Sequence, residues 1–323
     1  MNLIRAIALL RSLDITMKPR VAVGLLGALA AAALVAAAGP AQATYPGANG
    51  RLAFGMTVPG SAQPDVYSVL PNGEGLKQLT DDPAFDACAA YSADGKRIAY
   101  CSGAGDPAGQ FDIWTMKQNG KDKQRVTRLG GSATFPDFSP EGSKIAFNAR
   151  PAGAANADIY AIDADGSGLV QLTNAPGNDR YPAWSPDGSR IVFESERTGV
   201  NQVWVMNADG SGQTQLTFDS VPKDQTPDWS PDGTRIVYAT APGAGGDIWV
   251  MNADGGDQHP VSSGPELDFG PVWSPDGTKL AFSDVGSRTT FVMNADGSGR
   301  YPVYLGGLQF VPAWQPHPAD EDE

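Results

Sequence analysis

Four carboxylates recur at one position of an internal repeat, and these residues are the best suited in the sequence to chemistry. Counting five residues back from each repeated aromatic residue gives the set Asp86, Ala133, Asp179, Asp224, Asp268 and Gln309. Carboxylate oxygens are ligands that calcium prefers, and they also pair with the charged groups of Lys and Arg. Four of the six copies therefore predict a site for a cation or for a basic peptide segment.

Polar and aromatic residues stand beside these acids, as a concave binding site requires. The predicted ligand-binding residues are Asp86, Asp179, Arg180, Asp224, Gln225, Asp268 and Gln309, and the four acids among them are the candidate metal ligands. The aromatic neighbours are Tyr181, Phe269 and Phe310. The alternative interpretation is that the acids only mark the start of a strand and have solvated side chains, because acids in loops are common.

Other catalytic constellations are scarce. The sequence contains no Gly-x-Ser-x-Gly, and its two histidines, His259 and His317, stand in a predicted fourth strand and in the C-terminal tail. These facts argue against a serine or cysteine hydrolase and against a histidine metal centre. Residues 163–168 resemble the start of a calcium loop, but Asn174 stands where the bidentate Glu is required, which favours a structural turn.

The elements that must position these residues repeat with a period in the forties. The motif Trp-Ser-Pro-Asp-Gly occurs at 184–188, 229–233 and 273–277, with diverged copies at 91–95, 138–142 and 314–316. Its aromatic residues are separated by 47, 46, 45, 44 and 41 residues. Such a period is typical of a propeller or a repeat array.

Each unit predicts four short antiparallel strands, which in the clearest copy lie at 180–184, 190–194, 202–206 and 213–217. Six third strands are expected, at 65–67, 112–114, 158–160, 202–204, 247–249 and 290–292. Residues 50–54 match a second strand without a first, and 310–315 match a first strand without a second. The sequence therefore predicts an all-β, six-bladed β-propeller closed by pairing the N-terminal strands with a C-terminal strand.

The repeat assigns structural roles to most of the acids and aromatic residues. Eight acids stand in the two repeated turns, where short carboxylates support the backbone: Asp94, Asp187, Asp232, Asp276, Asp165, Asp209, Asp254 and Asp296. The repeated aromatic residue is expected to pack between neighbouring blades. The acids at the start of the first strands lie opposite these turns, so we expect them around one mouth of the central channel.

The N-terminus predicts an exported protein. Lys18 and Arg20 precede an apolar run over 21–38, and Ala41-Gln42-Ala43 offers a cleavage site. We expect a signal peptide over 1–43, starting at Met1 or Met17, a propeller over 44–316 and an acidic tail over 317–323. An uncleaved membrane anchor is the alternative, because the apolar run is just long enough to span a bilayer.

Charge and cysteine content narrow the compartment and the partners. The net charge of −13 argues against nucleic acid as a partner, because phosphate binding needs an excess of Lys and Arg. The only cysteines, Cys88 and Cys101, would stand directly opposite each other if 93–96 is a hairpin turn. A disulfide and two free buried thiols both remain open.

The Trp-Ser-Pro-Asp-Gly hairpin, followed by Ile-Val-Phe, Ile-Trp-Val-Met-Asn-Ala-Asp-Gly-Ser-Gly and Gln-Leu-Thr, resembles the repeat of TolB-type six-bladed β-propellers over about residues 50–316. The resemblance implies a periplasmic protein that binds other envelope proteins through the propeller mouth. TolB proper adds an N-terminal α/β domain, for which there is no room between the predicted cleavage site and the first blade. The repeat also resembles propellers of prolyl oligopeptidase-type enzymes, but no hydrolase domain follows Trp314.

These observations favour an exported, monomeric and non-catalytic propeller that presents its channel mouth to a protein or peptide partner. Its expected location is the periplasm or the outside of the cell, with membrane contact only through an uncleaved signal segment. No cofactor is required by this interpretation. The alternative is a calcium-dependent propeller hydrolase or lactonase with the metal at the mouth, which fold-level analogy alone cannot decide.

Overall fold

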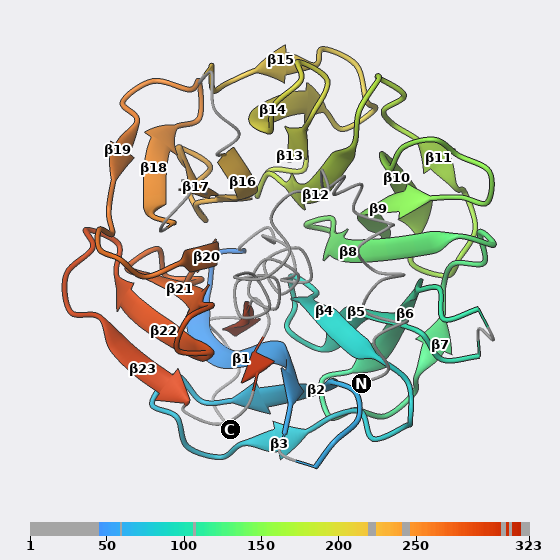
Figure 1. The fold of residues 1–323 in the computed structure, drawn as a ribbon, viewed down its shortest axis with the longest axis horizontal. Helices are drawn as coiled ribbons and strands as arrows, with labels where there is room; N and C mark the ends of the chain where they lie inside the picture. Colours follow the sequence, from blue (N-terminus) through green and yellow to red (C-terminus); the bar gives the residue numbers. More distant parts are fainter. Residues whose placement is uncertain are drawn as a thin grey trace, which may run out of the picture.

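The computed structural model describes residues 45–58, 60–105, 108–218, 224–240, 246–304, 308–309 and 312–317. Figure 1 shows six antiparallel sheets arranged as blades around a central channel. Every regular element of these residues is a strand, and none of them belongs to a helix that could span a membrane. The predicted all-β, six-bladed propeller is confirmed.

Each blade is a sheet whose first strand lines the channel and whose fourth strand lies at the rim. Blade 1 contains β24 (Leu308–Gln309), β25 (Ala313–His317), β1 (Ala48–Thr57), β2 (Asp65–Val69) and β3 (Lys77–Gln78). Blade 2 contains β4 (Asp86–Tyr91), β5 (Arg97–Ser102), β6 (Asp112–Lys117) and β7 (Gln124–Arg125). Blade 3 contains β8 (Ser132–Phe138), β9 (Lys144–Arg150), β10 (Asp158–Asp163) and β11 (Val170–Gln171).

The other three blades follow the same order. Blade 4 contains β12 (Asp179–Trp184), β13 (Arg190–Ser195), β14 (Gln202–Asn207) and β15 (Thr214–Gln215). Blade 5 contains β16 (Asp224–Trp229), β17 (Arg235–Thr240), β18 (Ile248–Asn252) and β19 (His259–Pro260). Blade 6 contains β20 (Asp268–Trp273), β21 (Lys279–Asp284), β22 (Thr289–Asn294) and β23 (Tyr301–Tyr304).

The two ends of the chain close the ring in blade 1. β1 pairs with β25 through Leu52 opposite Trp314, and with β24 through Met56 opposite Gln309. β24 and β25 are thus consecutive parts of one first strand, and the predicted closure is confirmed. β25 extends to His317, one residue beyond the predicted limit of the propeller.

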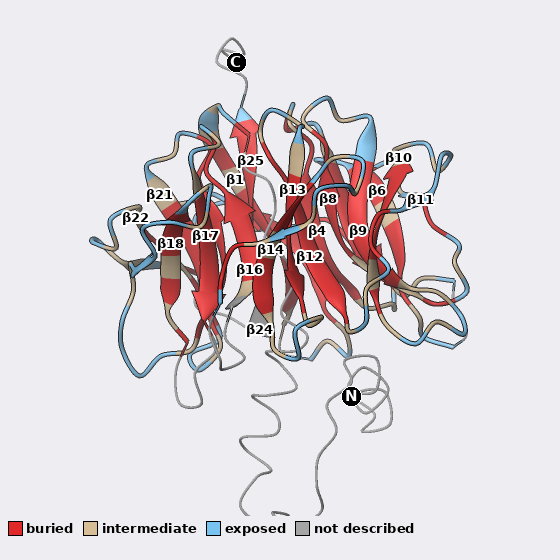
Figure 2. Cartoon of the chain, turned by 90° about the horizontal axis from the view of Figure 1, so that it is seen from above, coloured by how far each residue is buried: buried red, intermediate tan, exposed pale blue. Residues whose placement is uncertain are grey.

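The repeated aromatic residues pack between blades, as predicted. Trp229 and Trp273 are completely buried, and Figure 2 shows buried residues along most of the inner strands, such as β12, β13 and β4. Arg190 of blade 4 lies 4.6 Å from the ring of Trp229 in blade 5. A guanidinium over an indole ring adds a cation–π attraction to the apolar contact. Trp229 therefore joins blades 4 and 5 both by apolar packing and by this attraction.

The turn acids also have the predicted structural role. Asp187 accepts hydrogen bonds from the Ser185 hydroxyl at 2.6 Å and from the backbone N–H of Ser189 at 3.0 Å. In the second kind of turn, Asp209 accepts one from the backbone N–H of Ser211 at 2.9 Å. The other six acids make the same bond to the N–H two residues ahead: Asp94, Asp232, Asp276, Asp165, Asp254 and Asp296.

A bulge that the sequence analysis did not predict interrupts every first strand from β4 to β20. The residue three positions before the repeated aromatic has a left-handed backbone, with φ between 52° and 61°: Cys88, Phe135, Tyr181, Thr226 and Gly270. Only one of the five is glycine, although this conformation costs other residues roughly 1–2 kcal/mol each. The bulge separates the loop-side half of each first strand from the half that carries the repeated aromatic.

Candidate functional site at the loop end

The two ends of the propeller differ in what they carry. The turn end holds the two repeated turns of each blade, and the loop end holds the second-to-third-strand loops and the connections between blades. The first strands begin at the loop end. This end is therefore where the predicted binding residues lie.

The acids at the start of the first strands are buried rather than exposed at the mouth. Asp86 and Asp179 are completely buried and Asp268 is 2 % exposed. Asp224 begins β16 and Gln309 ends β24, but their side chains lie outside the described part of the structure. The burial of the three described acids argues against the alternative of solvated side chains, and their place around the mouth as a binding site stays a prediction.

Two of these carboxylates are paired with arginines of their own blade. Asp179 Oδ2 accepts a hydrogen bond from Arg197 Nη2 at 2.8 Å, and Asp268 Oδ2 accepts one from Arg300 Nη1 at 3.0 Å. Both guanidinium groups also lie over aromatic rings, Arg197 over Trp204 at 4.6 Å. Charge pairing lowers the cost of burying these carboxylates, which supports a structural role for both.

Asp86 differs from its counterparts. Neither of its buried carboxylate oxygens has a well-formed hydrogen bond among the described residues. The pKa of Asp86 is raised to about 6, mainly by burial and in smaller part by the carboxylates of Asp82 and Asp65, while the hydroxyls of Ser102 and Thr80 act against this rise. Blade 2 therefore holds a carboxyl group that takes up a proton near neutral pH.

The acids that begin the third strands are architectural. Thr127 donates to Asp112 Oδ1 at 2.6 Å and accepts a hydrogen bond from the backbone N–H of Ile113 at 2.9 Å. The same pair of bonds joins Thr80 with Asp65, Thr173 with Asp158 and Thr217 with Gln202. This network explains why Gln-Leu-Thr recurs together with Asp-Ile-Trp: the threonine hydroxyl joins the start of the third strand to the end of the fourth.

The other predicted site residues are mostly covered as well. Arg180 is 7 % exposed and its Nη1 donates to Glu196 at 3.0 Å, while Nη2 lacks a partner among the described residues. Tyr181 is buried against Phe135, with ring centroids 4.6 Å apart. Gln225 is half-buried, Phe269 is buried, and Phe310 lies outside the described residues. Arg180, Tyr181, Gln225 and Phe269 all lie near the start of their first strands, at the loop end of the ring.

No group of three or more His, Cys, Asp or Glu suited to a metal ion occurs among the described residues. At 163–168, Asp163 accepts a hydrogen bond from Lys144 Nζ at 2.6 Å, and Asp165 supports the turn backbone. Asn174 follows β11 in a between-blade connection, at the other end of the blade from this turn. The structural interpretation of 163–168 therefore holds, and a metal at the mouth stays a prediction.

Aromatic residues of the loop end escaped the sequence analysis. Phe218, in the connection from blade 4 to blade 5, is 75 % exposed, more than any other large apolar side chain that the structure describes. Phe85 and Phe111 meet edge to face at 5.1 Å beside blade 2. The repeat could have revealed Phe218. The four matching residues after the other fourth strands are polar or charged: Asp81, Arg128, Asn174 and Ser263.

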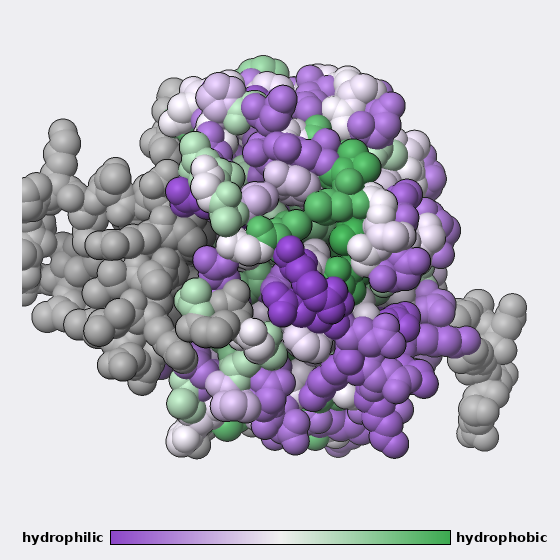
Figure 3. Space-filling view, turned by 90° about the vertical axis from the view of Figure 1, so that its right-hand side faces the viewer, coloured by the Kyte–Doolittle hydropathy of each residue, from purple (hydrophilic) through white to green (hydrophobic). Residues whose placement is uncertain are grey.

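The flank seen in Figure 3 is mainly hydrophilic. Figure 3 views the flank that includes the rim strands of blades 2 and 3, where green apolar atoms form one limited strip among purple hydrophilic ones. The exposed large apolar residues of blade 3 are Leu169 and Val170, at 44 % and 54 %. They lie at the rim beside a turn, far along the blade from the loop end, and provide a natural control for Phe218.

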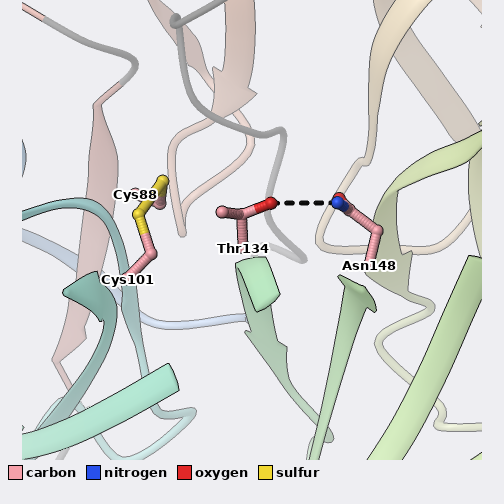
Figure 4. Close-up of a disulfide and its surroundings, with 4 residues drawn as sticks. All are labelled: Cys88, Cys101, Thr134 and Asn148. Carbon is pink, nitrogen blue, oxygen red and sulfur yellow. Dashed lines mark hydrogen bonds between the residues drawn. A yellow bond between two sulfur atoms is a disulfide. The ribbon is translucent and has the colours of Figure 1, made fainter. Parts of the chain in front are cut away.

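Cys88 and Cys101 form a disulfide in blade 2, with Cα atoms 5.5 Å apart. The predicted register is wrong, because the bulge shifts the pairing so that Ala87 stands opposite Cys101. Figure 4 shows the disulfide beside blade 3, where Asn148 donates a hydrogen bond to Thr134 at 2.9 Å. The disulfide therefore ties the bulge of β4 to β5 close to the junction between two blades.

Comparison with known proteins agrees with this architecture. The model of the TolB beta propeller domain matches residues 123–317, more than half of the chain. The structure of TolB from Acinetobacter baumannii aligns with a TM-score of 0.69 and 23 % identity, covering 83 % of this chain and 67 % of that one. A chain of a nidogen–laminin complex aligns with a TM-score of 0.68 and 13 % identity, covering 82 % and 98 %.

A curated relative is similar over a shorter stretch. Dipeptidyl-peptidase 5 of Porphyromonas endodontalis is 30 % identical over 88 residues, which are 27 % of this chain. The match spans only 12 % of that peptidase. The peptidase activity in its name therefore does not transfer to this chain.

Proposed function

Because the chain belongs to the TolB β-propeller domain family, we propose that it is an exported, non-catalytic binding protein whose loop end contacts a protein or peptide partner. The proposal places the protein in the periplasm or outside the cell. It assigns the propeller a role in recognition rather than in reaction chemistry.

The observation that carries this proposal is the contrast between the repeated features and Phe218. Turn acids, third-strand acids and repeated aromatic residues all have partners within the architecture. Phe218 has none of these roles, yet it exposes three quarters of its surface at the loop end. Exposed aromatic residues are enriched among the residues that dominate binding energy at protein interfaces.

Charge favours a partner with basic groups. The chain carries a net charge of −13, and Asp81 in the connection from blade 1 to blade 2 has a side chain that is 86 % exposed. Long-range attraction would speed the encounter with a basic surface, and the apolar contact at Phe218 would slow its release.

Two further observations support export. The sequence predicts a signal peptide over residues 1–43, and the protein has a disulfide, which is stable in oxidising compartments. The nidogen–laminin match adds that a propeller of this shape occurs in a complex between proteins, which supports a protein partner by fold analogy only.

The test compares two exposed apolar residues at different ends of the blades. Residues 44–323 carrying Phe218→Ser or Val170→Ser would be incubated with envelope and culture fractions of the source cells, crosslinked, and quantified against the unchanged protein. We expect Phe218→Ser to reduce the amount of captured partner roughly tenfold or more. A tenfold loss of affinity corresponds to about 1.4 kcal/mol, which is typical for the loss of an important interface side chain. We expect Val170→Ser to leave capture unchanged. Equal capture by both variants would contradict a loop-end interface.

A further inference from the structure

Two of the three described first-strand acids are bonded by an arginine, and the third is not. Asp179 is bonded by Arg197 at 2.8 Å, and Asp268 is bonded by Arg300 at 3.0 Å. Asp86 is completely buried, and neither of its oxygens has a well-formed hydrogen bond among the residues that the structure describes. Within those residues, blade 2 therefore holds the carboxylate without the bonded cation found in blades 4 and 6.

The repeat shows which residues of blade 2 replace the two arginines. Ala104 corresponds to Arg197, because the backbone N–H of each donates to the hydroxyl of the serine two residues earlier, at 3.0 and 3.3 Å. Lys123 corresponds to Arg300, because each stands three residues after the glycine of the second repeated turn. The position of Arg197 is thus neutral in blade 2, whereas the position of Arg300 keeps a positive charge.

Side chains at the position of Lys123 reach the surroundings of the first-strand acid in other blades. In blade 6, Arg300 bonds Asp268 directly. In blade 4, Gln213 accepts a hydrogen bond from Arg197, which is the arginine that bonds the acid of that blade. This position of the repeat therefore directs a side chain across the blade to the group around the first-strand acid.

Blade 5 gives the same indication for a residue next to Asp86. Gln258, at the position of Lys123, accepts a hydrogen bond from the hydroxyl of Tyr238 at 3.5 Å. Tyr238 corresponds to Tyr100 in blade 2, since each stands opposite a tryptophan of the third strand. Burial, and next to it the negative charge of Asp86, raises the pKa of the Tyr100 hydroxyl. The side chain of Lys123 thus belongs to the same group of residues as Asp86.

Lys123 itself is placed beside an exposed carboxylate. Its Nζ lies 3.7 Å from Oδ1 of Asp81, in the connection from blade 1 to blade 2. The side chain of Asp81 is 86 % exposed, and that of Lys123 is 27 % exposed. An ion pair with such an exposed member contributes little to stability, so another cation can replace the lysine at low cost.

The buried acid has the greater need for a cation. Burial, and in smaller part the carboxylates of Asp82 and Asp65, raises the pKa of Asp86. The backbone N–H of Asp86 donates to the carbonyl oxygen of Pro64 at 3.0 Å, so the acid lies at the junction between blades 1 and 2. A charged carboxylate buried near other acids destabilises the fold until a cation or a proton neutralises it.

We propose that Lys123 serves two carboxylates in turn: when a basic side chain of the partner binds Asp81, Lys123 moves from Asp81 to Asp86. This inference rests on the proposed function, because it names the group that the partner contributes, a lysine or arginine side chain, and the acid that receives it. Binding replaces one exposed ion pair by another and adds a pair at the buried acid. The junction between blades 1 and 2 thus strengthens binding although it does not touch the partner.

The test without the partner removes the charge of Asp81 and so releases Lys123. We expect Asp81→Asn to raise the melting temperature at pH 7.5 by about 2–4 °C, a shift typical of one modest interaction in a domain of this size. The gain should shrink as the pH falls from 6 to 4, because Asp86 is then protonated and no longer attracts the lysine. Carboxyl-carbon NMR should show the pKa of Asp86 falling below about 6 in this variant.

Two backgrounds show whether Lys123 and Asp86 cause the gain. In protein that carries Lys123→Gln or Asp86→Asn, the added Asp81→Asn should no longer raise the melting temperature. Glu266→Gln removes another exposed acid, in the connection from blade 5 to blade 6, and controls for the general relief of negative charge. The proposal is wrong if Asp81→Asn has no effect, acts only as strongly as Glu266→Gln, or keeps its gain without Lys123.

The capture assay separates this inference from the proposed function. We expect Asp81→Asn to reduce capture of the partner from envelope and culture fractions roughly tenfold, and Asp86→Asn to reduce it by a smaller factor. If Phe218→Ser reduces capture and neither acid substitution does, the loop-end interface stands and the transfer of Lys123 is wrong. If Phe218→Ser has no effect, the proposed function itself is wrong.

Discussion

The aspartates at the two ends of the propeller have opposite electrostatic states. At the turn end, the hydroxyl of Ser185 and the backbone N–H of Ser189 lower the pKa of Asp187, and Ser211 does the same for Asp209. At the loop end, burial raises the pKa of Asp86 and of Asp268 to about 6. A charged aspartate therefore stabilises the fold at the turn end, at Asp187 and Asp209. A charged aspartate destabilises the fold at the loop end, at Asp86 and Asp268.

This difference separates the acids that recur in nearly every copy of the repeat from the acids that differ between copies. The turn acids are the same in nearly every blade because each supports the same backbone turn. The loop-end acids vary, and where they occur they need an arginine, a hydroxyl or a proton. Buried ionisable groups that lower stability are found more often at functional sites than elsewhere. The loop end is therefore the better place to look for function.

The largest expected effect tests the frame that both ends share. Trp229→Ala should lower the free energy of unfolding by roughly 3–5 kcal/mol. The indole is completely buried between two blades, so its removal leaves a cavity and also removes the contact with the guanidinium of Arg190. Denaturant unfolding followed by far-UV circular dichroism measures the change. The exposed control Val170→Ala should change it by less than about 0.5 kcal/mol. A similar effect of both substitutions would show that the blades do not depend on this contact.

The next effect compares one acid from each end. Above pH 6 the charged form of Asp86 opposes folding, so Asp86→Asn should raise the free energy of unfolding at pH 7.5 by roughly 2–3 kcal/mol, following from a pKa shift from 3.8 to about 6. Because the folded-state pKa is raised, this gain should shrink as the pH falls from 6 to 4, where the folded state already binds the proton. Asp187→Ala should instead lower stability by about 1 kcal/mol at pH 7.5.

The pH dependence of Asp187→Ala should run the opposite way. The pKa of Asp187 is lowered in the folded state, so its contribution is present above the unfolded-state pKa and is lost as the pH falls through the folded-state value. Unfolding curves of both variants between pH 3 and 8 provide the measurement. If the two variants shifted stability in the same direction at pH 7.5, the contrast between the two ends would be wrong.

The sequence predicts the parts of this fold that are encoded by a periodic residue. The blade count, the closure through blade 1 and the burial of Trp229 follow from the repeat alone. It does not reveal which side chain covers a strand end, because Arg197 lies 18 residues from Asp179 and Arg300 lies 32 residues from Asp268. It also does not reveal the bulge, because Phe135, Tyr181 and Thr226 give no glycine signal for a left-handed backbone.

The smallest expected effect concerns calcium at the loop end, the alternative that the acid pattern raised. Asp179 and Asp268 are buried and already paired with arginines, so a calcium ion would have to displace a guanidinium that also packs on aromatic rings. We therefore expect 1 mM calcium to release no measurable heat in titration calorimetry and to leave the melting temperature unchanged. Asp179→Asn and Asp224→Asn provide the matched comparison. Asp179 is paired with Arg197, whereas Asp224 begins β16 and its side chain lies outside the described part of the structure. Calcium binding that either substitution abolishes would restore the metal-dependent alternative, and would place its site at the start of the first strands where the copies of the repeat differ.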